Sequence, residues 1–212
     1  MDRYFFMIRV LELLRRPGFL NRMAAGTLRA IGGFIVLLSL VTFFKVGKVI
    51  SGLPPSGVLG GVLFLVSDVL AVYAVVHTLI IRARDINKIG GSEFSMFPLV
   101  SILLQTFGEV FAAFMGLVAL GGGMYVWFTG KGVATVLDPL QALTPVFGDA
   151  TFLGGMQFMI GGVLLALAVL IVGYALSEVV DLLSETKRRL READRITEQS
   201  VTEPSLRFRS GT

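Results

Sequence analysis

Two acidic residues inside long apolar stretches are the best candidates for chemistry in this chain. Asp68 lies within GVLFLVSDVLAVYAVV, and Glu109 lies within LLQTFGEVFAAFM. A charge deep in a bilayer is costly, so an acidic residue in such a stretch is by default a functional hypothesis. Gln105 precedes Glu109 by one helical turn and is its nearest polar neighbour on the same face. These residue types suggest a proton or cation relay through Asp68, Glu109 and Gln105.

The depth of the two acids leaves two interpretations open. Counted inward from opposite ends at about 1.5 Å per residue, both lie roughly 15–20 Å deep, so they could be neighbours. By this count no Lys or Arg of the chain lies beside them, so they are protonated, hold a cation, face water or pair with another subunit. Either they form a relay, or they are protonated acids that hydrogen-bond to Gln105, Ser67, Ser101 or backbone. The first and fourth apolar stretches have almost no polar residues at mid-depth, which disfavours a transport path.

The composition predicts that these acids are held by membrane-spanning helices. Of the 212 residues 54% are hydrophobic and 16% are charged, whereas a soluble domain has about 25% charged residues. A helix needs about 20 apolar residues to cross a bilayer core of about 30 Å. Four stretches meet this length, at about residues 30–50, 57–81, 96–128 and 152–180. We therefore expect an all-α polytopic integral membrane protein with a four-helix transmembrane domain over residues 30–180.

The basic residues predict the orientation. Sixteen Lys and Arg residues lie before the first stretch, between the second and third, and after the fourth, and three lie in the other two connections. The positive-inside rule then places both termini in the cytoplasm. We expect a multi-pass protein of a bacterial-type inner (plasma) membrane. Because the basic residues are spread over these collars, they do not indicate a nucleic-acid partner.

Two segments outside the spans have helical patterns. Residues 2–16, within a cytoplasmic segment 1–29, separate polar from apolar side chains and predict an amphipathic helix on the membrane surface; a docking helix for a partner is the alternative. Residues 181–212 predict a cytoplasmic helical extension that becomes disordered from about Ser200. Leu183, Thr186, Leu190 and Ala193 give this extension a thin apolar stripe. It is either a solvated helix or a short coiled-coil contact.

Small residues repeat at helical spacing in the third and fourth stretches. Membrane helices associate through close packing, and small residues permit it. On a wheel of about 100° per residue, each of two sets falls on one face. The predicted helix-packing residues are Gly108, Ala112 and Gly116 in the third stretch, and Gly155, Gly162, Ala166 and Gly173 in the fourth.

The remaining motifs are informative by their absence from the sequence. The chain has no cysteine and a single histidine, His77, so disulfides, thiolate ligands and histidine-cluster metal sites are not expected. No phosphate-binding loop or hydrolase motif is present, and we expect no cofactor, no metal and no enzymatic activity. The expected function is a non-catalytic structural or accessory subunit of a larger inner-membrane complex or a homo-oligomer. Its partners are then the lipid bilayer and other membrane subunits or a second copy. The alternative is a proton- or cation-coupled channel or transporter component that uses the mid-membrane carboxylates.

Overall fold

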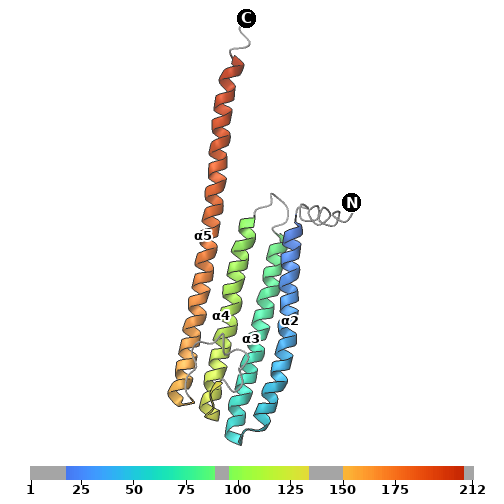
Figure 1. Ribbon diagram of the computed structural model, residues 1–212, viewed down its shortest axis with the longest axis vertical. Helices are drawn as coiled ribbons and strands as arrows, with labels where there is room; N and C mark the ends of the chain where they lie inside the picture. The colour runs from blue at the N-terminus through green and yellow to red at the C-terminus, as the bar shows by residue number, and fades with distance from the viewer. Residues whose placement is uncertain (1–17, 89–95, 134–149, 208–212) are drawn as a thin grey trace, which may run out of the picture.

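The structure, a computed structural model, describes residues 18–88, 96–133 and 150–207. Its described part is all-helical, with four long helices: α2 (Phe19–Ser51), α3 (Pro55–Lys88), α4 (Met96–Thr129) and α5 (Phe152–Arg207) (Figure 1). All four are long and apolar enough to cross a membrane. The predicted amphipathic helix over residues 2–16 lies outside the described residues.

The four helices stand in a row. The extensive packing is between sequence neighbours, α2 with α3, α3 with α4, and α4 with α5. Figure 1 shows them side by side in this order, so α2 and α5 form the two edges. A helix that packs only on its neighbours leaves two of its sides uncovered. Large apolar side chains accordingly remain exposed on all four helices, among them Phe34, Tyr73, Phe107 and Leu164.

The helix ends follow from local backbone chemistry. Pro55 begins α3, where its missing N–H would have no intrahelical acceptor and its fixed φ favours the first turn. The N–H of Gly57 donates to the carbonyl of Pro54 at 2.8 Å and closes the tight turn from α2. Gly130 ends α4 in the left-handed region, with φ of 60°, and its N–H donates to the carbonyl of Val126 at 2.9 Å. This is the usual role of glycine after a helix.

Two clusters of buried apolar side chains lie between the helices, one toward each end of the helix axes. The first gathers Ile50, Phe64, Val118, Tyr125 and Phe158 from all four helices. The second gathers Leu28, Val75, Leu79 and Ile86 from α2 and α3, with residues of α4 packed against it. The core is therefore elongated along the helix axes.

Glycines set the spacing of the helices at the first cluster. A Cβ atom on Gly61 would lie 2.5 Å from Ile50, and one on Gly60 would lie 2.6 Å from Phe128. On α4, a Cβ on Gly121 would lie 2.5 Å from Ser67. Side chains do not approach a Cβ this closely, so glycine is needed at these positions for the helices to pack as they do. These tight contacts were not among the predicted packing residues.

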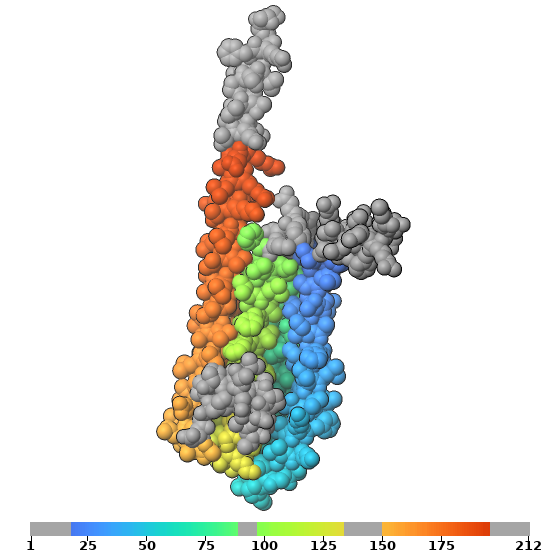
Figure 2. Space-filling view, viewed as in Figure 1, coloured from blue at the N-terminus to red at the C-terminus, as the bar shows by residue number. Residues whose placement is uncertain are grey.

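The last helix continues far beyond its neighbours. α5 has 56 residues, a length of about 84 Å at 1.5 Å per residue. Figure 2 shows it rising as a single column past the ends of the other helices. The helix runs to Arg207, past Ser200, where the sequence predicts disorder to begin. The extension is therefore continuous with the apolar part of α5.

Candidate functional site

Glu109 joins three helices. Its carboxylate accepts a hydrogen bond from Nε of Arg82 at 2.8 Å and a second one from Nη2 of the same side chain. The hydroxyl of Tyr174 donates to Glu109 Oε1 at 2.5 Å. Because Arg82 belongs to α3, Glu109 to α4 and Tyr174 to α5, this ion-pair cluster connects the three helices. A two-pronged arginine–carboxylate contact is among the stronger and more directional polar interactions in proteins.

The ion pair is partly shielded from solvent. The side chains of Arg82 and Glu109 are 19% and 21% exposed. Removing one partner from such a pair leaves the other charge in a poorly solvated place. The expectation that no Lys or Arg lies beside Glu109 is wrong. Residues 96–108 and 110–129 of α4 contain no charge, so the charge beside Glu109 comes from Arg82 of α3.

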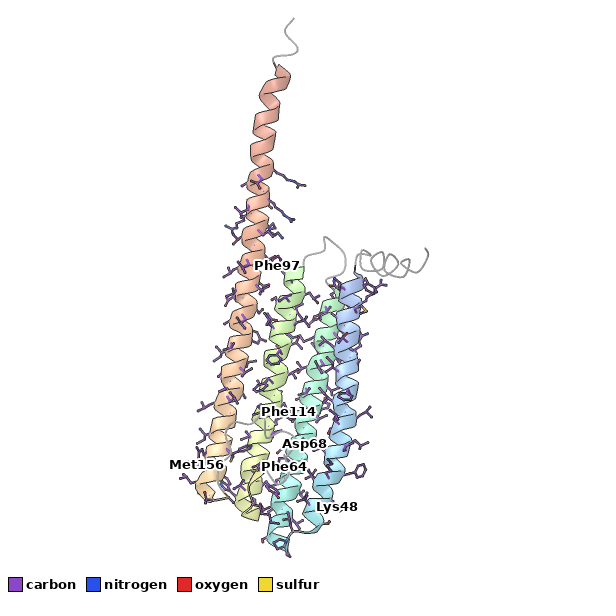
Figure 3. All side chains as sticks on the ribbon, in the orientation of Figure 1. Lys48, Phe64, Asp68, Phe97, Phe114 and Met156 are labelled. Carbon is purple, nitrogen blue, oxygen red and sulfur yellow. The ribbon has the colours of Figure 1, made fainter. Side chains whose placement is uncertain are left out.

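Asp68 lies elsewhere in the row. It is 14 residues from Arg82 on α3, which is about 21 Å along the helix axis. Its neighbour Ser67 packs against Gly121 of α4, 12 residues beyond Glu109, or about 18 Å. Figure 3 shows Asp68 toward the same end of the helices as Phe64 and Lys48. The two acids, which the count of depth allowed to be neighbours, therefore lie apart.

The surroundings of Asp68 are apolar. The residue is 5% exposed, and within the described part of the chain its Oδ2 has no hydrogen-bond partner. The helix face on which it lies carries Phe64, Ala71 and Val75, which are all buried. A charge at this position would be strongly disfavoured. Because the side chain is enclosed by its own chain, it is not presented to another subunit. Pairing with another subunit was one of the possibilities that the sequence left open for this acid.

A second polar cluster lies between α4 and α5. The Oγ of Ser101 donates to Oδ2 of Asp181 at 3.0 Å and lies 2.7 Å from the Oγ of Ser177. The Nε2 of Gln105 donates to the Oγ of Ser177 at 2.7 Å. Since the proton of Ser101 points to Asp181, Ser177 must be the donor between the two serines. The serine cluster is thus a directed chain of hydrogen bonds from Gln105 through Ser177 and Ser101 to the carboxylate of Asp181.

The two clusters lie beside a close approach of α4 and α5. A Cβ on Gly173 would lie 3.1 Å from both the Cα of Gly108 and the carbonyl oxygen of Leu104. Gly108 lies one residue from Glu109, and Gly173 lies one residue from Tyr174. The short backbone separation at these glycines lets the polar side chains of both helices reach one another.

The other predicted packing residues are placed as follows. Gly155 and Gly162 face α4, where their added Cβ atoms would meet Trp127 and Ala119. Ala166 is buried, and Ala112 is half-buried. Gly116 faces open space, because a Cβ there would meet no atom within 4 Å. Among the described residues, the face of α4 that was predicted from the four-residue repeat is therefore in close contact at Gly108 and not at Gly116.

The predicted relay residues fall into three different environments. Asp68 is enclosed alone, Glu109 belongs to the ion-pair cluster, and Gln105 belongs to the serine cluster. The sequence analysis missed Arg82 as a partner, and also Tyr174 and Ser177. One signal was available: Glu109 is the only charged residue of α4, so a charge that neutralises it within the chain has to come from a neighbouring helix. Among the described residues, no group of three or more His, Cys, Asp or Glu side chains is arranged to hold a metal.

No protein-family model, curated protein or solved structure matches this chain. Its function must therefore be argued from its own residues. The polar groups at the α4 interfaces are engaged in contacts between helices, which is what groups that fix helix positions do.

Proposed function

We propose that this protein is a multi-pass membrane protein that serves as a non-catalytic structural or accessory subunit, in a larger inner-membrane complex or a homo-oligomer. The observation that carries the proposal is the single row of helices. Each helix packs on its sequence neighbours, and both broad sides of the row retain large apolar side chains. Lipid covers such a surface in part, and helices of other subunits are its natural further partners.

The polar contacts support the same role. Glu109 is neutralised by Arg82 and held by Tyr174, and the serine cluster ties α4 to α5. Hydrogen bonds between membrane helices contribute modestly to association and fix how the helices are turned toward each other. Side chains used in this way hold the row in shape for an interaction partner.

The alternative, a proton- or cation-coupled transport component, requires a connection between the two acids. Asp68 and Glu109 are separated by about 18 Å along the helices, and the side chains of Phe64, Ala71 and Val75 around Asp68 are apolar. We therefore favour the structural role. Flux measured in liposomes with the wild type and with Asp68→Asn tests the alternative: flux that the substitution abolishes in an intact protein would replace our proposal.

The assembly state is the direct test of the proposed role. The chain has a mass of 22.9 kDa, and native mass spectrometry after gentle extraction from its own membrane measures what accompanies it. We expect either fixed stoichiometry with other proteins or a closed homo-oligomer. A monomer at native abundance would contradict the proposal.

The orientation has its own test, because the chain contains no cysteine. A single cysteine introduced by Lys131→Cys lies between α4 and α5, and one introduced by Arg195→Cys lies in the extension. The positive-inside rule places the first outside and the second in the cytoplasm. We expect a membrane-impermeant maleimide to label the first in intact cells and the second only after permeabilisation. The reverse pattern would contradict the proposed topology.

A further inference from the structure

An apolar stripe runs along the uncovered side of α5. Val172, Leu176, Val179, Leu183 and Leu190 are spaced by four, three, four and seven residues. Their exposed fractions lie between 48% and 63%. Alternating steps of three and four residues produce the seven-residue repeat of a coiled coil. The stripe passes without interruption from the apolar part of α5 into its extension.

The stripe is separate from the side of α5 that packs on α4. That packed side carries Gly173 and Ser177, which are buried. At about 100° per residue, the two sides are roughly 110° apart. α5 is also an edge of the row, so the stripe lies to one side of its contact with α4. An additional helix could lie along it without displacing α4.

The part of the stripe beyond Asp181 cannot be explained by lipid. There the helix is rich in charge, as in SETKRRLREADR, and it continues past the ends of its neighbours (Figure 2). Leu183 and Leu190 are nevertheless exposed. Thr186 lies between them, and its hydroxyl donates to the carbonyl of Leu182 at 2.9 Å, so its methyl group is left for packing. A lone helix of about 20 residues is only marginally stable in water, and a partner helix on an apolar face stabilises it.

We infer that this stripe binds the same stripe of a second copy, so that α5 helices of identical copies pair in a parallel coiled coil. This inference rests on the proposed function and names its partner. Two copies inserted alike in one membrane must present their extensions in parallel. In that pair Leu176, Leu183 and Leu190 occupy one core position of the repeat, and Val179 and Thr186 occupy the other.

The flanking charges fit a parallel pair of identical helices. In this repeat Arg189 and Asp194 take the two flanking positions that meet across a parallel dimer, five residues apart. Arg189 of each copy therefore faces Asp194 of a neighbouring copy. Arg189 already contacts Glu185 in its own chain at 3.0 Å. Among the described residues Asp194 has no ion-pair partner, so it is available to the second copy.

Disulfide formation between introduced cysteines tests the inference in native membranes. Leu183→Cys, Thr186→Cys and Leu190→Cys place the thiol in the stripe, and Arg188→Cys and Glu192→Cys are matched controls on the opposite side. After mild oxidation, we expect at least fivefold more cross-linked dimer from the stripe positions than from the controls. Equal yields at all five positions, or no dimer at any, would overturn the inference.

Native mass spectrometry of the same membranes separates this inference from the proposed function. Fixed stoichiometry with other proteins but no cross-linked dimer overturns the coiled coil and leaves the subunit role standing. A monomer without cross-links overturns both. Periodic cross-links together with the mass of a homo-oligomer support both.

Exchange of the flanking charges tests the parallel register. In the Leu190→Cys background, we expect Arg189→Asp and Asp194→Arg each to lower the dimer yield about threefold, within the range of exposed ion pairs. The double substitution restores the contact between copies and should restore the yield. Recovery cannot come from Glu185, because the exchanged charge at position 189 repels it. A double variant as weak as the single variants would overturn the register.

Discussion

The approach of α4 and α5 predicts which of three glycines tolerates a methyl group. In Gly173→Ala the new Cβ would lie 3.1 Å from the Cα of Gly108 and from the carbonyl oxygen of Leu104. Both are backbone atoms, so the clash is relieved only if the helices separate. A Cβ on Gly108 meets its nearest atoms at 3.5 Å, and one on Gly116 meets nothing within 4 Å. The three positions thus form a graded series on one helix pair.

The expected loss follows from the size of the overlap. Overpacking a close contact costs about 1–3 kcal/mol. Because the neighbours of Gly173 must shift by only a few tenths of an ångström, we expect Gly173→Ala to lower the free energy of unfolding by about 1–2 kcal/mol. Gly108→Ala and Gly116→Ala should stay within about 0.5 kcal/mol of the wild type.

The only tryptophan of the chain provides the assay. Trp127 stacks on Phe152 of α5 at 5.0 Å between ring centroids, and its Nε1 donates to the carbonyl of that residue at 2.8 Å. Its fluorescence therefore reports separation of α4 from α5 during an SDS titration of the purified protein in mild detergent. Equal losses at all three glycines, or an unchanged Gly173→Ala variant, would refute the reasoning from backbone proximity.

Four further substitutions test the polar residues in the same titration. Arg82→Met and Glu109→Gln should each lower the free energy of unfolding. Their double variant should lose less than the sum of the two single losses, with a coupling energy of about 1–3 kcal/mol. Losses that add within about 0.5 kcal/mol would argue against the ion pair. Tyr174→Phe removes one hydrogen bond to the carboxylate and should cost about 1 kcal/mol, less than Glu109→Gln; an equal or larger loss would contradict this ranking. Asp68→Leu removes a buried carboxyl whose Oδ2 is unpartnered and should leave stability unchanged or raise it by about 1 kcal/mol; a clear loss would reveal a partner for Asp68.

The positions of the apolar stretches were predictable from the sequence, and the helix ends were not. The stretch predicted over residues 57–81 lies inside α3, which runs from Pro55 to Lys88. The first stretch was predicted from residue 30, yet α2 begins at Phe19. Apolar length measures how much of a helix suits a bilayer, while charged residues such as Arg22 and Arg29 continue the same helix beyond it.

The candidate site shows where the sequence argument failed. Asp68 and Glu109 were assigned a shared depth because each was counted inward from an opposite side. Since α3 and α4 have 34 residues each, about 51 Å, two depths of about 15–20 Å counted from opposite ends do not meet. In the structure Glu109 lies beside Arg82, about 18 Å along the helices from the level of Asp68. The pairing of Gln105 with Ser177 depends on how α4 and α5 face each other. A single helical wheel does not contain that information.

The three consecutive glycines of α4 have a consequence for how the row tolerates sequence change. Gly121 meets Ser67 of α3, whereas Gly122 and Gly123 meet Phe158 and Met159 of α5. These three glycines thus pack against two different neighbouring helices. An edge helix must match a neighbour on one flank only. Inserting one residue upstream in α4 would turn these glycines by about 100° and disrupt the interfaces with both α3 and α5. The same insertion in α2 would disrupt only its interface with α3.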